Sequence, residues 1–227
     1  KNYSGDCMNF DGAAEMAEDD DIKVEKVYVN DDVAVKDSLY TIGRRGVAGT
    51  VFVHKIAGAA AEKGHELLKV KTAAEKAIQN VRSIGFAFTS CTVPAKGSPT
   101  FTLGDDEMEF GVGIHGEPGI AREKIVSADE LAEKMLNRII VDLPYESGDD
   151  IALMVNGFGS TPLQELYLLN NSVNKILENK NINVYKTFVG NYMTAIDMSC
   201  ASISLMKLDE ELKELLYYPS DAPAFKV

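Results

Sequence analysis

Hydrophobic and polar residues alternate along this chain with two different periods, which predict helices and strands in turn. An apolar face of helical spacing predicts helices over residues 7–20, 47–61, 66–82, 127–140 and 209–217, and one that begins near Thr161-Pro162. Period-two alternation or a short apolar run predicts strands at residues 23–29, 108–114, 151–155, 182–189 and 201–208. Because strands alternate with helices, we expect an α/β fold with a functional site in loops at the strand ends.

Residues 89–100 interrupt this pattern and are the best candidate for a linker. They contain two prolines, a glycine and several hydroxyl side chains, which favour loops. The length of 227 residues suits one large α/β domain or two small ones. In the second case we expect two α/β domains with mixed sheets flanked by helices, the first over residues 1–85 and the second over 86–227. Beyond the linker, Ser127 and Glu130 have the spacing of a capping box at the start of a helix.

Composition and charge exclude several classes of protein. With 45% hydrophobic and 26% charged residues, the chain has the make-up of a globular protein and not of a disordered one. A net charge of −12 repels phosphate backbones and anionic lipids, so we expect no nucleic-acid partner and no membrane association. No apolar run approaches the roughly 20 residues that a membrane-spanning helix needs.

Motifs for metals, disulfides and nucleotides are weak or absent. Cys7, Cys91 and Cys200 are scattered without the spacing of a disulfide framework or a metal site, which favours a reducing, cytoplasmic compartment. The sequence lacks the Walker A motif Gly-x-x-x-x-Gly-Lys-Ser/Thr. We interpret residues 43–49 as a tight turn into a packed helix, with a phosphate cradle as the alternative. Residues 156–161 suit an anion-binding loop or an ordinary strand-to-helix turn. We expect no cofactor and no metal on this chain.

Of the three histidines, His115 is the best candidate for a catalytic residue. It lies within residues 111–119 (GVGIHGEPG), at the expected end of a strand, where glycines on both sides leave space for a small ligand. Glu117 could orient one ring nitrogen and leave the other free. The residues alone leave two interpretations open, a loop histidine and a catalytic one. We interpret His54 and His65 as structural or partly exposed residues.

Separate segments of the chain resemble the dihydroxyacetone-binding subunit of dihydroxyacetone kinases. The most specific segment is Gly113-Ile114-His115-Gly116-Glu117-Pro118-Gly119. The others are Lys1-Asn2-Tyr3-Ser4-Gly5-Asp6, Gly43-Arg44-Arg45-Gly46-Val47-Ala48-Gly49-Thr50, Ser90-Cys91-Thr92-Val93-Pro94, Val155-Asn156-Gly157-Phe158-Gly159-Ser160-Thr161-Pro162 and Val189-Gly190-Asn191-Tyr192-Met193-Thr194. Because these segments occur in the same order as in the family, together they are far more specific evidence of the resemblance than any one segment.

This resemblance implies a two-domain α/β subunit that forms a homodimer, with a site made of three residues. The family's substrate-binding histidine matches His115, whose imidazole adds to the ketone carbon of dihydroxyacetone as a covalent hemiaminal. Its acid/base aspartate matches Asp6, which by itself is an aspartate in an expected turn, and a substrate-contacting lysine matches Lys1. An adenine nucleotide and magnesium are expected on a partner kinase subunit, with ATP and phosphoenolpyruvate both open as the donor.

The resemblance also leaves alternatives open. The family has a glycine-rich loop with a second active-site histidine upstream of its lysine motif. We therefore expect a segment that precedes Lys1 and an incomplete first domain, with a mature form that begins here as the alternative. Ser4 replaces the usual threonine, and residues 198–202 depart from the family's usual composition. Some relatives sense dihydroxyacetone as coactivators of a transcription regulator. Intact Lys1, Asp6 and His115 argue against a third function, that of an inactive scaffold.

Overall fold

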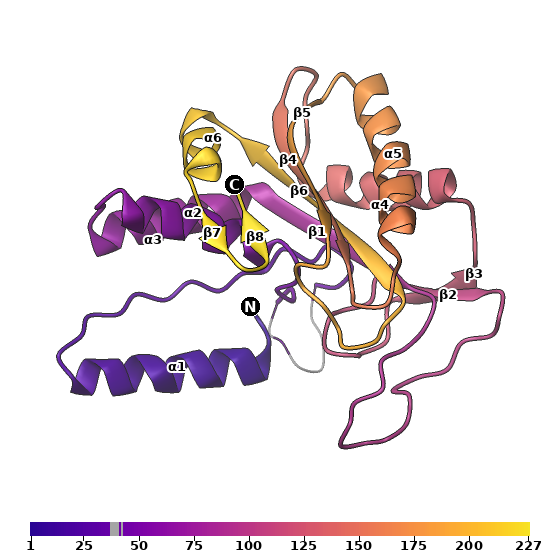
Figure 1. Ribbon diagram of the computed structural model, residues 1–227, viewed down its shortest axis with the longest axis horizontal. Coiled ribbons are helices and arrows are strands. Elements are labelled where there is room, and N and C mark those ends of the chain that lie inside the picture. Colours follow the sequence, from indigo (N-terminus) through magenta and orange to yellow (C-terminus); the bar gives the residue numbers. More distant parts are fainter. Residues whose placement is uncertain (37–40, 42) are drawn as a thin grey trace.

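The computed structural model describes residues 1–36, 41 and 43–227, and its centre is a six-stranded sheet with helices on both faces (Figure 1). The strand order is β3-β2-β1-β6-β4-β5. The strands are β1 (Val81–Ala87), β2 (Glu107–Phe110), β3 (Ala121–Lys124), β4 (Asp150–Gly157), β5 (Asn183–Gly190) and β6 (Cys200–Leu208). The helices are α1 (Ser4–Asp19), α2 (Thr50–Glu62), α3 (Leu67–Asn80), α4 (Ala128–Asp142), α5 (Leu163–Asn179) and α6 (Glu210–Tyr217). A small hairpin of β7 (Asp221–Ala222) and β8 (Phe225–Lys226) follows α6.

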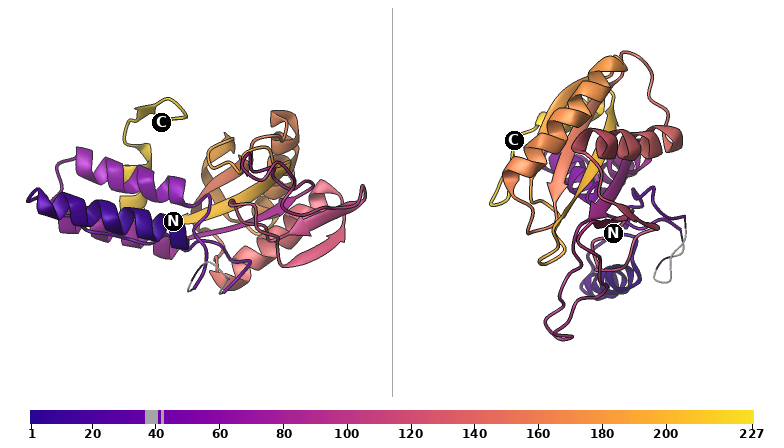
Figure 2. Two further views of the ribbon diagram at one scale, coloured as in Figure 1. Left: turned by 90° about the horizontal axis from the view of Figure 1, so that it is seen from below. Right: turned by 90° about the vertical axis from the view of Figure 1, so that its right-hand side faces the viewer.

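The sheet is mixed and covered on both sides. β4 and β5 run parallel, whereas the other neighbouring strands of the sheet run antiparallel. Helices α4 and α5 pack on one face, and α2, α3 and α6 pack on the other (Figures 1 and 2). The predicted α/β class, with a mixed sheet flanked by helices, is confirmed.

Burial on both faces explains the continuous apolar sequence of β4. Leu153 and Val155 pack with the residues of α4 and α5, whereas Ala152 and Met154 pack with those of α2, α3 and α6. Successive side chains of a strand point to opposite faces, so both sets of positions must be apolar when helices cover both faces.

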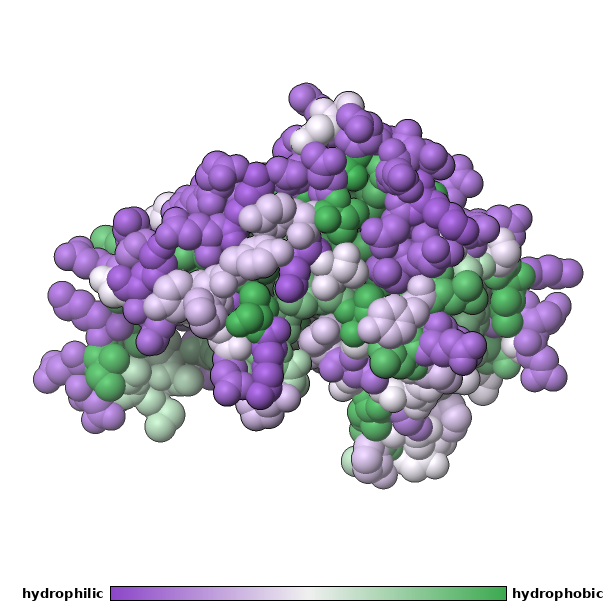
Figure 3. All heavy atoms as spheres, turned by 45° about the horizontal axis from the view of Figure 1, so that its top comes forward, coloured by the Kyte–Doolittle hydropathy of each residue, from purple (hydrophilic) through white to green (hydrophobic). Residues whose placement is uncertain are grey.

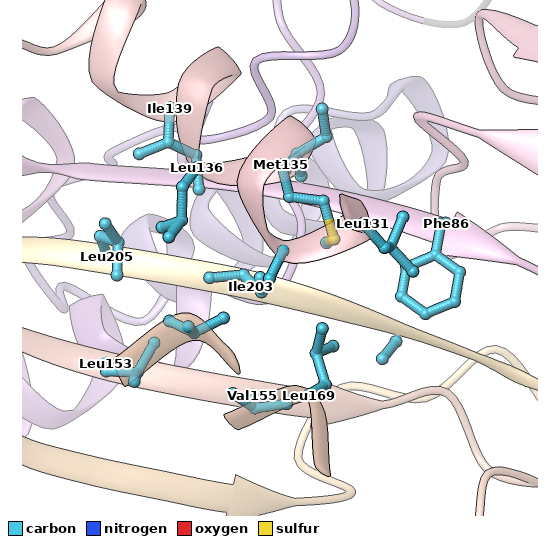
Figure 4. Packing of buried hydrophobic residues seen from close by; sticks show 14 of the residues in the cluster. Phe86, Leu131, Met135, Leu136, Ile139, Leu153, Val155, Leu169, Ile203 and Leu205 are labelled. Carbon is cyan, nitrogen blue, oxygen red and sulfur yellow. The ribbon is translucent and has the colours of Figure 1, made fainter. Parts of the chain in front are cut away.

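Ile203 on the central strand β6 tests this placement of the core. Its side chain is fully buried and lies near the middle of the cluster in Figure 4. We expect Ile203→Ala to lower the free energy of unfolding by about 2–5 kcal/mol, because it removes buried methyl groups and leaves a cavity. Urea denaturation measures this loss. Val141→Ala is the control, since Val141 on α4 is 84% exposed and its truncation should change stability by about 0.5 kcal/mol or less. Equal effects of the two substitutions would contradict this packing.

Most of the predicted elements are present, with shifted ends. The structure contains the strands predicted at 151–155, 182–189 and 201–208, and the capping box formed by Ser127 and Glu130 is confirmed. The helix predicted at 66–82 ends at Asn80, and the next residues form β1, which the sequence patterns did not predict. Strands β3, β7 and β8 were likewise not predicted.

The strand predicted at residues 23–29 is wrong, because no strand covers these residues in the described chain. A strand needs a neighbour for its backbone hydrogen bonds, and alternation alone does not supply one. The segment instead bridges helices through its side chains. Lys26 and Tyr28 both donate to Asp11 on α1, at 2.8 and 2.7 Å, and Glu25 pairs with Lys71 on α3.

The predicted domain boundary between residues 85 and 86 falls inside β1, which pairs with β6 along its whole length. The candidate linker at residues 89–100 is irregular, as its composition predicts, apart from a bridge between Thr92 and Pro99. How the chain divides into domains stays a prediction.

Helix α1 lies to one side of the sheet, below α2 and α3 in Figure 1. Ala14 is its buried residue, whereas Met8, Phe10 and Met16 are exposed. Polar side chains cover most of the face shown in Figure 3, and apolar side chains form separate patches between them. Within the described residues, every helix is too short or too polar to cross a membrane.

Candidate active site

Three side chains from distant parts of the sequence meet beside the N-terminal end of α1. Nε2 of His115 lies 3.2 Å from Oδ2 of Asp6, although the two residues are 109 positions apart. The other carboxylate oxygen of Asp6, Oδ1, lies 3.2 Å from Nζ of Lys1. Each of these side chains is about one-fifth exposed, so a small molecule can reach them from solvent. The structure thus brings together all three residues that the sequence singled out.

Asp6 lies in the first turn of α1, which corrects its predicted place in an isolated turn. The helix begins at Ser4, two residues before it. A carboxylate in the first turn is favoured by the free N–H groups of the helix end. The helix therefore fixes the direction of Asp6, and the residue does not simply cap its own backbone.

Tyr3 restricts the orientation of the His115 imidazole. The two rings stack with centroids 3.7 Å apart and planes that differ by 8°. Stacking on one face leaves the ring edge, with Nε2, directed toward Asp6. No sequence pattern indicated this contact, because nothing in the local spacing places residue 3 beside residue 115.

The surroundings of His115 favour its neutral form. Burial lowers the pKa of the imidazole below its ordinary value of 6.5, because a buried cation loses hydration. The carboxylate of Glu117 opposes this change, the ammonium of Lys1 adds to it and Asp6 opposes it. The net lowering leaves the ring largely neutral at pH 7, with a lone pair on one nitrogen.

The loop after β2 carries His115, and its glycines allow its path. β2 ends at Phe110, so His115 lies within the loop and not at the predicted strand end. Gly111 and Gly116 have φ angles of +77° and +78°, a conformation that favours glycine. A Cβ at Gly116 would also collide with the sulfur of Cys91.

Glu117 contacts the backbone of His115 and not its ring, which corrects the predicted orienting role. Oε2 of Glu117 accepts a hydrogen bond from the His115 backbone N–H at 3.1 Å. Its other oxygen, Oε1, lies 3.2 Å from Nη1 of Arg45. The ring nitrogen is instead contacted by Asp6. Glu117 therefore holds the loop, and Asp6 faces the imidazole.

A cavity of about 580 Å³ adjoins Lys1 and Asp6 and runs between α1, residues 24–29 and α2. Most of its lining is apolar, and it includes His54 of α2, whose pKa is lowered because the ring loses part of its hydration. His65 lies in the connection between α2 and α3, away from this lining. Neither His54 nor His65 joins the cluster around Asp6.

The two loop motifs that suggested anion binding serve as entries to helices. Residues 43–49 lead into α2, with Gly49 as its N-cap, which confirms the predicted turn into a packed helix. Residues 156–161 connect β4 with α5. Within the described part of the chain, no three side chains of His, Cys, Asp or Glu gather as metal ligands do.

The fold and the site define a mixed α/β protein in which a lysine, an aspartate and a histidine converge on one accessible point. The chain belongs to the Dak1 domain family, whose sequence model matches residues 1–224. The resemblance inferred from the separate motifs is thereby confirmed.

Sequence relatives agree with this assignment. The chain is 50% identical over 226 residues to the dihydroxyacetone-binding subunit DhaK of PTS-dependent dihydroxyacetone kinase 1 from Listeria innocua, covering 99% of the chain and 69% of that subunit. It is 42% identical over 248 residues to the corresponding subunit of the PEP-dependent kinase from Escherichia coli, covering 99% and 70%. It covers 64% of the length of the subunit from Lactococcus lactis.

Solved structures show the same fold. A coactivator of a dihydroxyacetone kinase operon, DhaQ, is similar with a TM-score of 0.89 and 32% identity over 96% of this chain and 68% of its own. The dihydroxyacetone kinase of C. freundii is similar with a TM-score of 0.85 and 30% identity over 100% of this chain and 42% of its own.

Proposed function

We propose that this chain is the dihydroxyacetone-binding part of a dihydroxyacetone kinase and that it presents the ketone for phosphoryl transfer. The observation that carries the proposal is the contact of the His115 ring with Asp6, which also contacts Lys1. A neutral imidazole, a carboxylate and an ammonium group thus meet at one accessible point. The names of the sequence relatives supply the substrate.

The ketone is held by a covalent bond to Nε2 of His115, the nitrogen that faces Asp6. While Nε2 contacts the carboxylate of Asp6 it carries the ring proton, because a carboxylate only accepts. The ketone displaces this contact and reacts with the tautomer whose proton is on Nδ1: the Nε2 lone pair forms a bond to the central carbon, the carbonyl π bond breaks, and the carbonyl oxygen takes up a proton. The Nδ1 proton leaves to solvent, so the product is a neutral hemiaminal. Glycerol has no carbonyl and forms no such bond, so selection rests on bond formation and not on a few hydrogen bonds.

Asp6 acts as the general base in phosphoryl transfer. A ketone bonded to Nε2 displaces the direct contact between the ring and the carboxylate, which places a substrate hydroxyl beside Asp6. The carboxylate accepts the hydroxyl proton as the oxygen attacks phosphorus. Lys1, already paired with Asp6, contacts the substrate and holds the carboxylate in place.

The adenine nucleotide and its magnesium belong to a partner kinase subunit in this proposal. The sequence lacks a Walker A motif, and a dihydroxyacetone kinase similar to this chain over 42% of its own length has been solved with AMP-PNP and Mg²⁺. The names of the relatives that are 42–50% identical favour a phosphoenolpyruvate-linked donor. The family resemblance also supports a homodimer and the division into two domains, and the scattered cysteines favour a cytoplasmic location.

Ligand binding and turnover together test the proposal. Calorimetry should show binding of dihydroxyacetone to the protein and much weaker binding of glycerol. Addition of a nucleotide-binding kinase subunit and its donor should yield dihydroxyacetone phosphate. Equal affinity for the ketone and for glycerol would contradict selection at the carbonyl.

A second function, a dihydroxyacetone sensor that activates a transcription regulator, is favoured by the likeness to the operon coactivator. Both functions predict ketone binding at His115. The sensor has no need of a general base or of a kinase partner, so turnover with that partner discriminates between the two.

The adduct should depend on pH through His115. Only the neutral ring has a free lone pair, so the adduct is lost as pH falls through the imidazole pKa. Because burial lowers this pKa from 6.5, we expect full adduct at pH 7–8 and loss only at more acid pH. Binding calorimetry between pH 5 and pH 8 measures this profile. Loss of binding between pH 8 and pH 7 would contradict the lowered pKa.

A further inference from the structure

One buried arginine, Arg45, contacts the loop that carries His115 on both sides of this residue. Its side chain is 2% exposed. Nη2 donates to the carbonyl oxygen of Gly111 at 2.8 Å, where the loop begins, and Nη1 contacts Glu117, two residues after His115, at 3.2 Å. Glu117 in turn accepts the hydrogen bond from the backbone of His115. The guanidinium is therefore two contacts away from the backbone of His115.

The position of Arg45 is fixed against the central sheet through Asp32. Nε of Arg45 donates to Oδ2 of Asp32 at 2.7 Å, and both side chains are almost fully buried. Asp32 forms a parallel bridge with Ser83 on β1, and its Oδ1 accepts from the backbone N–H of Ala34. Arg45 and Asp32 thus connect the loop around His115 to β1, in the middle of the sheet.

The turn that carries Arg45 also holds the segment with Lys1 and Asp6. The backbone N–H of Gly46 donates to the carbonyl oxygen of Asn2 at 3.2 Å, and the side chain of Asn2 donates to the carbonyl oxygen of Arg44 at 2.6 Å. A Cβ at Gly46 would collide with the carbonyl oxygen of Val29 and would lie 2.8 Å from the Cα of Lys1. One turn therefore contacts both parts of the site.

We propose that Arg45 is a positioning residue: through Glu117 it sets the His115 imidazole at the distance from Asp6 that the reaction needs. This inference rests on the proposed function. A planar guanidinium can reach Asp32, the Gly111 carbonyl and Glu117 at once, whereas the single ammonium of a lysine cannot. Close packing of the turn on both segments leaves little room for compensation. Small errors of position are costly in such sites, since a shift of about 1 Å can lower a rate by roughly a hundredfold.

Arg45→Lys is the first test. The substitution keeps a positive charge to pair with Asp32, but it removes the planar guanidinium group that reaches three partners at once. We expect the apparent affinity for dihydroxyacetone to fall about tenfold or more, with less adduct in the NMR spectrum of 2-¹³C-labelled ketone. The matched control is Arg82→Lys. Arg82 is less buried, with 17% of its side chain exposed, but it likewise pairs with a carboxylate, that of Asp142, and its hydrogen bonds and ion pairs within the described residues do not include the His115 loop. Wild-type affinity in a folded Arg45→Lys protein would overturn the proposal.

Glu117→Gln gives a second test that does not depend on the folding of the Arg45 variant. The side chain keeps an acceptor for the His115 backbone but loses its ion pair with Arg45. The charged or titratable groups that face the ring are Asp6, Lys1, Glu117 and Tyr3, and Glu117 raises the pKa of His115. We expect weaker binding at pH 8 together with a lower His115 pKa in an NMR titration of its ring protons. Unchanged affinity and an unchanged pKa would overturn the proposal.

The two proposals fail in different ways. Absence of adduct in the wild-type protein contradicts the covalent mechanism. The role of Arg45 is then judged on noncovalent affinity, which the Arg45 and Glu117 variants must both lower, and on the pKa of His115, which Glu117→Gln must lower, while Arg82→Lys changes neither.

Discussion

His115→Ala is expected to abolish the covalent adduct and to reduce the affinity for dihydroxyacetone to that for glycerol. The ketone and glycerol differ at the central carbon, and His115 is the residue that we propose to bond there. The remaining contacts, from Lys1 and Asp6, are made to hydroxyl groups that both molecules carry. Calorimetry with the two ligands, together with the NMR signal of the labelled ketone, measures the effect.

His65→Ala is the matched control for this substitution. His65 lies between α2 and α3, and its ring contacts the side chain of Lys69. Its removal should leave both affinities unchanged. If the His115→Ala protein still preferred the ketone strongly over glycerol, discrimination would have to come from groups other than the imidazole.

Asp6→Asn is expected to lower turnover by roughly 10²–10⁴-fold, the range typical of losing a general base. Binding of the ketone should change little. Asparagine is of similar size but accepts no proton at neutral pH. Because the charge of Asp6 raises the pKa of His115, its loss keeps the ring neutral and able to form the adduct. Initial rates with the kinase partner at saturating ketone measure the effect.

Asp11→Asn provides the control on the same helix. Asp11 accepts hydrogen bonds from Lys26 and Tyr28 and has no contact with the His115 ring. It should retain normal turnover. Near-normal turnover in Asp6→Asn would remove Asp6 from the mechanism as its general base, whereas an absence of turnover in the wild-type protein would favour the function as a ketone sensor.

The sequence predicted the elements that have a strong local pattern. The apolar runs of β4 and β6 are continuous because helices cover both faces of the sheet, and the capping box of α4 is set by residues three positions apart. Strand β1 was not predicted, since its apolar residues continue the pattern of α3 without a break. Residues 23–29 show the opposite error, because their alternation is that of a strand but no partner strand exists in the described chain.

Some residues of the candidate site could likewise be predicted from the sequence, whereas the roles of others depend on contacts between distant positions. The family resemblance pointed to Lys1 and Asp6, the glycine-flanked loop also pointed to His115, and the structure shows Asp6 in contact with both of the others. The roles of Tyr3 and Arg45 were not predictable from the sequence patterns. Arg45 contacts Glu117, which lies 72 positions away in the sequence, and local residue spacing does not indicate a contact over such a separation. Glu117 was placed near His115 correctly, but its partner is the backbone N–H and not the ring.

The most direct test of the central claim is the NMR spectrum of the wild-type protein with 2-¹³C-labelled dihydroxyacetone at pH 8. The covalent mechanism predicts that the signal of the bound central carbon moves from the carbonyl region to that of a tetrahedral carbon, and that this signal is absent with His115→Ala. A bound ketone whose central carbon keeps its carbonyl signal would contradict the mechanism.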